Sequence, residues 1–358
     1  MGKIIYIVGI GGRTGAMFCR ELQGAARIIG VGMDREIEAI NNGKIKTRRG
    51  EGQPEILKTE IVRSGDFAAA AELNPPDFIW LAVRNPVAEA VKFYYSSFKG
   101  RERIPALILS QNGLSAIGDA QTVLREALGQ DADRVEIVRV SLINGIDLRM
   151  EEAAFANGYG EPRAAFAPAG ATASRGGIAI INYKLPVKLG FGILDGQNSD
   201  FKDILRAGHI RAQEFKGQDV FNMENSKLFT NLIGMVSAIR GVAADQGLRD
   251  KKIFKEEIAA LGEYVRAVKK SGNGFVDDFC GYPIKFLAQM MLWPLWLLLP
   301  LRGLLANIVA KGRNRPKDLS EIDYYNGEVV KLGKQFNIPT SANEAIVAKA
   351  KEWHGVDK

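Results

Sequence analysis

The sequence predicts an α/β protein in which a doubly wound, mainly parallel sheet is followed by a mainly α-helical C-terminal domain. Short apolar runs alternate with helical patterns from residue 3 to about residue 145, which is typical of βα units around a parallel sheet. From about Asn222 onward the apolar residues recur with helical periodicity instead. We therefore expect two domains, residues 1–215 with connecting strands at their end, and residues 216–358.

The strands of the first domain are predicted where short apolar runs stand between polar segments. These runs are Ile4–Val8, Ile28–Met33, Ile56–Val62, Phe78–Val83, Ala106–Leu109 and Val135–Val140. Helical candidates lie between several of them, at residues 14–24, 66–73, 86–98 and 115–128. Ligands of such a sheet bind at the carboxyl ends of its strands, so the residues that follow each run are the first candidates for a site.

The pattern becomes irregular from about residue 150 to residue 215, with many Gly, Ala and Pro residues. Gly177–Tyr183 and Val187–Ile193 are β-like runs in this region, which indicates a connecting part of the first domain. In the second domain we expect helices at residues 222–246, 251–270, 284–310, 317–334 and 342–354.

Composition limits the function classes. Lys and Arg exceed Asp and Glu by 48 to 41, but the basic clusters, at residues 44–49 and 311–317, lack the interleaved aromatics of a nucleic-acid surface. Two cysteines cannot form a disulfide framework, and two histidines argue against a His-rich metal site and a Ser-His-Asp apparatus. The first apolar run is too short for a cleavable signal peptide. We expect a cytoplasmic protein with no metal, no nucleic-acid partner and no transmembrane span.

A glycine-rich turn follows the first apolar run. Gly9, Ile10, Gly11, Gly12, Arg13 and Thr14 stand between this strand and the next helix. A Gly-x-Gly turn that opens into a helix is how a dinucleotide pyrophosphate is held at a helix N-terminus. Thr14 occupies the place of the third glycine of that fingerprint, with Gly15 directly after it. The turn predicts a Rossmann-type dinucleotide site, and the alternative is an ordinary strand-to-helix turn.

The residues after the second strand indicate which dinucleotide is bound. Asp34 would accept from the ribose hydroxyls of NAD, whereas Arg35 would pair with the 2′-phosphate of NADP. Arg84, after the strand at 78–83, supplies a second cation for that phosphate. These residues together favour NADPH/NADP as the cofactor, and the alternative is that both arginines are solvated loop residues.

Three further polar positions could carry chemistry. Asn112 lies in a polar turn after the strand Ala106–Leu109, where it could touch both nicotinamide and substrate. Lys227 and Asn231 are one turn apart on one helix face, and the small residues Gly234 and Ala238 roughly continue that face. Each position also has a plainer interpretation, as a turn asparagine and a surface lysine.

Glu321 stands three residues after Asp318, so it is either part of a helix cap or a carboxylate directed at the site. The motifs Gly9-x-Gly11, Gln111-Asn112-Gly113, Lys227-x-x-x-Asn231 and the run from Ser320 to Gly327 occur in this order along the chain. Together they resemble the ketopantoate reductase (2-dehydropantoate 2-reductase) family over nearly its whole length.

The resemblance implies NADPH binding by the N-terminal domain and a role for each motif residue. Lys227 matches the family's proton donor, and Glu321 matches its active-site glutamate, which also contacts the cofactor. Asn112 and Asn231 match the asparagines that contact cofactor and substrate, and Arg35 and Arg84 fall where the family places cations for the 2′-phosphate. Two positions depart from the pattern: Met235 replaces a substrate-binding Asn, and no Ser stands near residues 308–309.

These observations predict an NADPH-dependent reductase of a 2-oxo acid, most simply of ketopantoate to pantoate on the route to coenzyme A. The alternatives are a related dehydrogenase for a bulkier, more apolar 2-oxo acid or an opine-like substrate, and a non-catalytic nucleotide-binding sensor. A homodimer is a further expectation. The uncharged run at residues 286–301 is too short and too rich in proline to cross a bilayer. Burial in the core is its plainest interpretation, and our hypothesis is partial exposure beside the substrate cleft or at a subunit contact.

Overall fold

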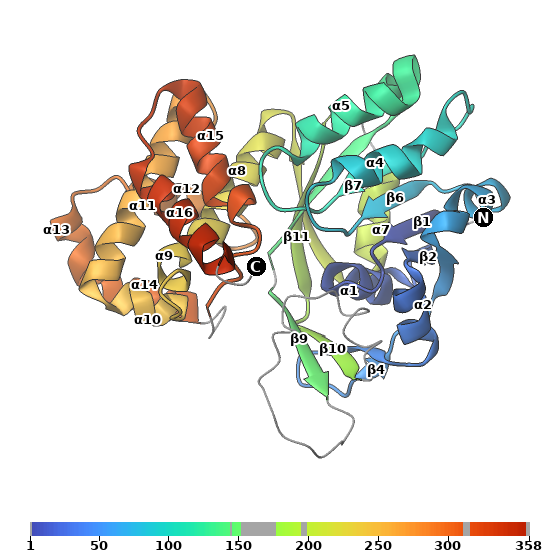
Figure 1. Ribbon diagram of the computed structural model, residues 1–358, viewed down its shortest axis with the longest axis horizontal. Coiled ribbons are helices and arrows are strands. Elements are labelled where there is room, and N and C mark those ends of the chain that lie inside the picture. Colours follow the sequence, from blue (N-terminus) through green and yellow to red (C-terminus); the bar gives the residue numbers. More distant parts are fainter. Residues whose placement is uncertain (1, 144, 152–176, 195–198, 311–315, 356–358) are drawn as a thin grey trace. The chain divides into compact units, whose positions relative to one another are not determined.

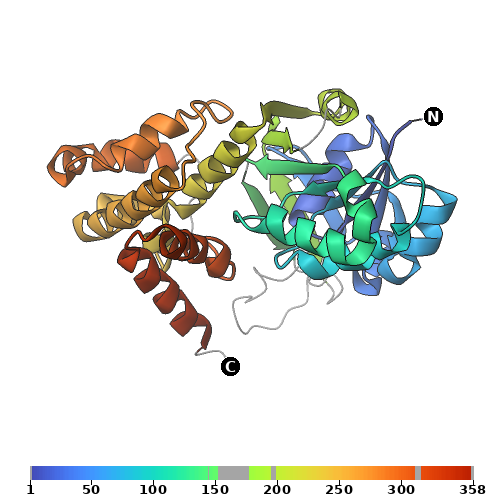
Figure 2. The same ribbon diagram turned by 90° about the horizontal axis from the view of Figure 1, so that it is seen from above.

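The computed structural model describes residues 2–143, 145–151, 177–194, 199–310 and 316–355 (Figure 1). The chain divides into two compact units. Unit 1 comprises Met1–Gln111 and Ala116–Lys216, and unit 2 comprises Asn112–Ser115 and Gly217–Lys358. Unit 1 holds a mainly parallel sheet and unit 2 is helical (Figures 1 and 2). The predicted α/β fold class is confirmed.

The large sheet of unit 1 has the strand order β12-β11-β8-β7-β6-β1-β2-β5. All neighbouring pairs are parallel except β8 with β11. Its strands are β1 (Ile4–Val8), β2 (Arg27–Gly32), β5 (Glu60–Arg63), β6 (Phe78–Leu81), β7 (Ala106–Leu109), β8 (Ile137–Leu142), β11 (Val187–Ile193) and β12 (Ile210–Lys216). The order reverses direction between β1 and β6, which is where a doubly wound sheet binds its ligand.

Both faces of the sheet are covered, because successive side chains of each strand enter different cores. Ile5 and Ile7 of β1 pack in one cluster, and Tyr6 and Val8 pack in the other. The helices of unit 1 are α1 (Arg13–Leu22), α2 (Asp34–Asn41), α3 (Phe67–Leu73), α4 (Ala88–Tyr95), α5 (Ala116–Leu128) and α7 (Ser199–Ala207). Residues of α1 and α7 join the first cluster, and residues of α3, α4 and α5 join the second.

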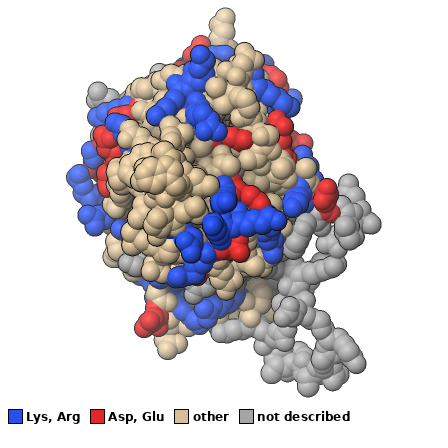
Figure 3. Space-filling view, turned by 90° about the vertical axis from the view of Figure 1, so that its left-hand side faces the viewer, with Lys and Arg blue, Asp and Glu red and all other residues tan. Residues whose placement is uncertain are grey.

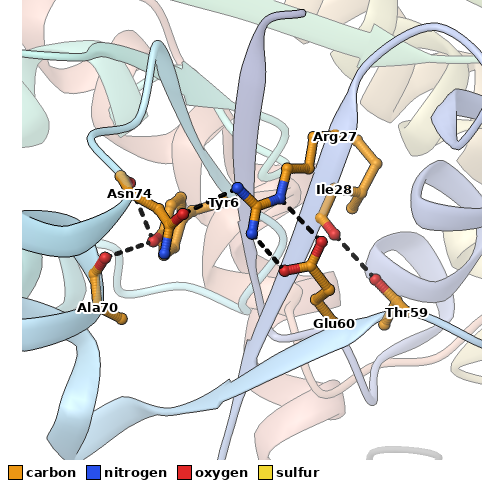
Figure 4. A network of polar contacts seen from close by, with 7 residues as sticks. All are labelled: Tyr6, Arg27, Ile28, Thr59, Glu60, Ala70 and Asn74. Atoms are coloured by element: carbon orange, nitrogen blue, oxygen red, sulfur yellow. Dashed lines mark hydrogen bonds and ion pairs between the residues drawn. The ribbon is translucent and has the colours of Figure 1, made fainter.

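A polar network ties the edge of the sheet to the end of α3 (Figure 4). The Arg27 guanidinium donates to both carboxylate oxygens of Glu60, at 2.8 and 2.7 Å, and to Asn74 Oδ1 at 2.8 Å. The Tyr6 hydroxyl donates to the carbonyls of Ala70 and Asn74, at 3.0 and 3.1 Å. The bidentate pair of Arg27 with Glu60 links β2 to β5. These bonds therefore hold β2, the strand that precedes Asp34 and Arg35.

A smaller sheet, β4-β3-β10-β9, packs on α1. Its strands are β3 (Ile45–Arg49), β4 (Glu55–Ile56), β9 (Ile146–Glu151) and β10 (Ile178–Tyr183). The prediction of one strand at 56–62 is wrong, because β4 and β5 belong to different sheets and residues 57–59 between them are not in a strand. The charged strand β3 escaped prediction, since its Lys and Arg side chains hide the apolar pattern.

The helices of unit 2 begin after Gly217. They are α8 (Gln218–Leu232), α9 (Met235–Ala238), α10 (Ala244–Arg249), α11 (Lys251–Lys270), α12 (Ile284–Met290), α13 (Leu295–Leu298), α14 (Arg302–Ala310), α15 (Asn326–Phe336) and α16 (Ser341–Gly355). Helix α11 is the longest of these, and its first turn is capped by Asp250, which accepts from the Lys252 and Ile253 N–H groups at 2.8 Å each.

Three predicted helices of unit 2 are shorter or broken. The helix expected at 222–246 ends at Leu232, because Gly234 has φ +89° and a Cβ there would lie 2.5 Å from the Cβ of Ala244. Gly234 and Ala238 therefore do not continue the face of Lys227 and Asn231. The run at 284–310 is divided into α12, α13 and α14 at Pro294 and Pro300, and the helix expected from 317 begins only at Asn326.

Candidate active site

The glycine-rich turn lies at the carboxyl end of β1. Gly9 has φ +81°, and its N–H and that of Ile10 donate to the Val31 carbonyl at 3.0 and 3.3 Å. A Cβ on Gly9 would lie 3.1 Å from the Ala82 carbonyl oxygen. The turn is therefore restricted to glycine both by its backbone angle and by the neighbouring strand end.

Gly15 performs the packing role of the fingerprint's third glycine. A Cβ on this residue would lie 2.4 Å from the Gly9 carbonyl oxygen, a distance that no side chain can occupy. Its lack of a side chain lets α1 approach the turn closely. The shift of this glycine by one place, from Thr14 to Gly15, thus leaves the helix–turn contact intact.

Helix α1 presents its N-terminus at this turn. The N-cap, Gly12, contributes no side-chain bond to the helix, and no acidic residue lies in the first turn. The first N–H groups of a helix need external acceptors, and the helix dipole favours an anion there. These residues fit a dinucleotide pyrophosphate, with Gly11, Gly12, Arg13 and Thr14 beside it.

Charged residues lie at or just after the carboxyl ends of β2, β5 and β6. The Asp34 carboxylate is 3.2 Å from Arg63 Nε, and both side chains are exposed, as are Arg35 and Arg84. Arg63 was not among the predicted site residues, although its place at the end of β5 could have indicated it. Its pairing offsets the charge of Asp34, which is the residue that argued for NAD.

Glu36 is a buried carboxylate at the same place. Its Oε2 accepts from the Met33 N–H at 2.9 Å, and a Cβ on Gly11 would lie 2.7 Å from its Oε1. Burial raises the pKa of Glu36 above its ordinary value, because desolvation disfavours the charged form. Gly11 thus leaves room for the Glu36 side chain.

Four polar side chains of unit 2 form one hydrogen-bonded group. Asn112 Nδ2 donates to Glu321 Oε2 and to the Tyr325 hydroxyl, at 2.9 Å each, and Asn112 Oδ1 accepts from Asn231 Nδ2 at 3.0 Å. The Tyr325 hydroxyl donates to Glu321 Oε2 at 3.0 Å. All four side chains are half-buried. Three of the predicted residues, Asn112, Asn231 and Glu321, are therefore in direct contact.

Lys227 lies on α8, four residues before Asn231, and is half-buried. Side chains at this spacing point from the same helix face. The helix start expected near Glu321 is absent from the described structure, since this residue precedes a 3-10 turn at Ile322–Tyr324. Its carboxylate accepts from Asn112 and Tyr325.

The end of α8 is held by a lysine and a glutamate that the sequence did not single out. Lys317 Nζ donates to the carbonyls of Thr230 and Asn231, at 3.2 and 2.7 Å. Glu257 is fully buried and accepts from the Gly234 and Val236 N–H groups, at 2.6 and 3.1 Å. Burial raises the pKa of Glu257 to about 7, although these bonds and the charge of Lys317 oppose the shift.

Two further residues qualify the predicted site. Tyr325 was quoted within the C-terminal motif but was given no role, and its hydroxyl joins Asn112 to Glu321. Met235, which replaces a substrate-binding Asn of the family, is fully buried in an apolar cluster with Leu319, Ile322 and Ile346. Its side chain therefore packs in the core of unit 2.

Comparison with known proteins agrees with this arrangement. The family model described as "Ketopantoate reductase PanE/ApbA C terminal" matches residues 313–354. The family resemblance is thereby confirmed. This match contains Glu321 and Tyr325 of the hydrogen-bonded group, so the ketopantoate reductase signature covers one side of it. No curated protein sequence matches the chain.

Solved structures extend the likeness in fold to nearly the whole chain. A PanE/ApbA family ketopantoate reductase from Ralstonia eutropha JMP134 shares 15% identity, with 98% of this chain and 97% of that chain covered and a TM-score of 0.67. D-mandelate dehydrogenase, solved with NADH and anilino(oxo)acetate, shares 13% identity over 98% and 97% of the chains, with a TM-score of 0.65. The 2-dehydropantoate 2-reductase of Methylococcus capsulatus shares 14% over 98% and 96%, with a TM-score of 0.63. Identities this low show the fold.

Proposed function

We propose that this protein is an NADPH-dependent reductase of a 2-oxo acid, most simply of 2-dehydropantoate (ketopantoate) to pantoate. The observation that carries the proposal is the bonded group of Asn112, Asn231, Glu321 and Tyr325 with Lys227 one helical turn from Asn231. A cation, amide groups and a carboxylate are the set that ketone reduction requires, and these residues would supply it.

When bound, the reduced nicotinamide supplies a hydride to the substrate carbonyl carbon. The chain supplies the proton: the Lys227 ammonium polarises the carbonyl oxygen and transfers a proton to it, and the resulting amine regains a proton from water. Asn231 holds the carboxylate or the hydroxyl end of the substrate through its amide. Glu321 orients Asn112 through the bond from its amide.

Asn112 organises the group through its donors. Its two N–H bonds are given to Glu321 and Tyr325, and its oxygen accepts from Asn231. Asn231 is therefore the amide that contacts the substrate, and Asn112 holds the Asn231 side chain in place.

The choice of NADPH rests on three arginines. Arg35 and Arg84 are exposed and follow the carboxyl ends of β2 and β6, and Arg63 pairs with Asp34 at 3.2 Å. Charge-assisted bonds to a phosphate each contribute about 1.5–3 kcal/mol. Glu36 is the opposing observation, since a carboxylate beside the turn favours the ribose hydroxyls of NADH.

A second candidate is a dehydrogenase for a bulkier, apolar 2-oxo acid. The buried Met235 supports it, because the family has a substrate-binding Asn at this position. The similarity in fold to D-mandelate dehydrogenase is compatible with such a substrate.

One experiment tests both candidates. NADPH oxidation by the purified protein is followed against a panel of 2-oxo acids that includes ketopantoate and phenylglyoxylate. Turnover of ketopantoate with the highest kcat/KM supports the first candidate, and preference for the aromatic acid supports the second. Tight nucleotide binding with no turnover of any 2-oxo acid would instead favour a nucleotide-binding sensor.

A further inference from the structure

Six large apolar side chains are exposed together on α12, α13 and α14 and their connections. We call this set the apolar face: Phe286, Trp293, Trp296, Leu297, Leu304 and Ile308. Trp296 is 70% exposed, Leu304 60% and Phe286 52%. The predicted partial exposure of the 286–301 run is thus confirmed. Solvent exposure of several such residues in one segment marks a surface that binds a partner.

The exposed side chains stand on a well-anchored segment. Ala288, Met291, Leu298 and Ala306, from the same helices, are buried. The Met291 carbonyl oxygen lies so close to α11 that a Cβ on Gly262 would be 3.2 Å from it. The rings of Phe286 and Trp293 pack edge to face with centroids 6.1 Å apart. The segment is therefore held in place by its buried residues, and the side chains of the apolar face remain in solvent.

The segment that carries the apolar face is basic. Residues 279–317 contain no Asp or Glu, and Lys285 and Arg302 stand on α12 and α14, two of the helices that carry the face. The basic residues at 311–315 lie outside the described residues, and Lys317 is bonded to the end of α8. Arg302 Nε donates to the Arg249 carbonyl at 3.3 Å, and Arg249 in turn bonds Asn307 of α14, which brings a further cation to the same helix.

An acidic residue lies at the border of this surface. Lys285 Nζ is 2.9 Å from Asp277, an exposed pair that water screens. Figure 3, which looks toward the end of the molecule that carries α13, shows a broad uncharged area bordered by Lys and Arg, with Asp and Glu between some of them. The partner must therefore accept tryptophan and leucine side chains and carry negative charge.

We propose that the apolar face docks on the surface of a lipid bilayer that contains anionic lipids. Indole rings prefer the headgroup level of a membrane, and basic residues beside them are attracted by anionic headgroups. Within the described residues, no helix is both long and apolar enough to cross a bilayer. Short helices with Trp and Leu on one side match attachment at the surface.

A second copy of this chain fits the surface less well. In a two-fold symmetric contact the same patch meets itself, so the cations at its edge would be brought together without acidic partners from the same segment. An anionic bilayer satisfies both the apolar side chains and the surrounding charge. The inference does not depend on the proposed reaction.

The test is sedimentation of the full-length protein with vesicles of phosphatidylcholine alone or mixed with phosphatidylglycerol. We expect binding to the mixed vesicles that falls as salt is raised. Trp296→Ser and Leu304→Ser should each lower the partition coefficient at least about tenfold. Lys285→Gln should lower it about fivefold. Trp fluorescence should shift to shorter wavelength on binding.

Leu73→Ser is the matched control, because Leu73 is 82% exposed but lies on α3 of unit 1. It should bind vesicles as the unchanged protein does. Equal loss of binding in this variant, or no binding to either kind of vesicle, would overturn the proposal. Self-association that Trp296→Ser abolishes, without vesicle binding, would assign the apolar face to a second copy. Salt-independent binding to neutral vesicles would contradict the role of the basic residues.

Discussion

The side chain of Asn231 donates to Asn112 Oδ1 at 3.0 Å, which joins helix α8 to the segment that follows β7. The bond determines which way the Asn112 amide faces, because its oxygen is committed to Asn231 and its nitrogen to Glu321 and Tyr325. Asn231 retains its own oxygen and a second N–H outside this bond. Glu321 and Tyr325 therefore fix the Asn112 amide, and Asn112 in turn holds the Asn231 side chain.

Removing the Tyr325 hydroxyl should weaken this organisation. Tyr325→Phe leaves Asn112 and Glu321 each without one hydrogen bond. Because a bond to a charged group contributes about 1.5–3 kcal/mol, we expect kcat/KM to fall at least about tenfold. Steady-state kinetics measures it. Tyr282→Phe, which removes an exposed hydroxyl of unit 2, is the control and should have unchanged kinetics. Equal kinetics in both variants would remove Tyr325 from the site.

Replacing the proposed proton donor should separate binding from chemistry. Lys227→Met keeps the length of the side chain and removes its ammonium, whose interaction is strongest with charge that develops in the transition state. We expect kcat to fall about 10²- to 10⁴-fold with nucleotide affinity nearly unchanged. Single-turnover kinetics and nucleotide titration measure the two quantities. The matched variant Lys255→Met, at an exposed lysine of α11, should retain full turnover.

The cations after β2 and β6 should discriminate between the two dinucleotides. Arg35→Ala and Arg84→Ala should each weaken NADPH binding about tenfold, and NADH binding should change little. Calorimetric titration with both nucleotides gives the ratio. Arg125→Ala, an exposed arginine on α5, is the control. If the unchanged protein bound NADH as tightly as NADPH, the predicted preference for NADPH would be contradicted. The cofactor would then be determined by Glu36 and Asp34.

A methyl group at Gly15 should damage the dinucleotide turn. Gly15→Ala places its Cβ 2.4 Å from the Gly9 carbonyl oxygen, so α1 or the turn must move. We expect a loss of about 1–3 kcal/mol in the free energy of unfolding and loss of nucleotide binding. Gly118→Ala is the control, because a Cβ at this exposed position of α5 meets no atom within 4 Å. It should be neutral or stabilising by about 0.5–1 kcal/mol.

Glu257 should make stability depend on pH near neutrality. Its pKa is raised from 4.5 to about 7, so the folded protein binds more protons than the unfolded chain between these values. The free energy of unfolding therefore falls as pH rises from about 4.5 to 7, by about 3 kcal/mol from this residue. Denaturant titrations across the range measure it. Glu257→Gln should abolish this decline, and an unchanged pH profile in that variant would contradict the assignment.

The sequence predicted best the elements whose buried positions are mostly apolar. Ile4–Val8, Ala106–Leu109, Val187–Ile193 and residues 251–270 have the predicted bounds, because apolar side chains recur along these strands and along one face of the helix. Strand β3 and the edge strand β12 carry charged side chains at partly or fully exposed positions, so their periodicity is weak. The break of α8 at Gly234 depends on contact with Ala244, which no local pattern contains.

The sequence predicted three residues of the hydrogen-bonded group but not the hydrogen bonds between them. Asn112, Asn231 and Glu321 belong to separate motifs, and the sequence does not state that one asparagine would serve as the link between the other two. Tyr325 lay within a recognised motif without an assigned role. Lys317 and Glu257 act on the backbone of α8 and α9. Their contribution depends on tertiary contacts that local spacing does not encode.

The four residues Asn112–Ser115 belong to unit 2 although unit 1 flanks them on both sides in the chain. Unit 2 is therefore formed by two separate segments of the chain, and the smaller segment carries Asn112, whose amide is bonded to both Asn231 and Glu321. A chimera that exchanges only the chain after Lys216 with a relative would pair foreign helices with the original Asn112 segment. Recombination among such proteins should preserve function only when both pieces travel together, which couples the evolution of the loop after β7 to that of the helical half.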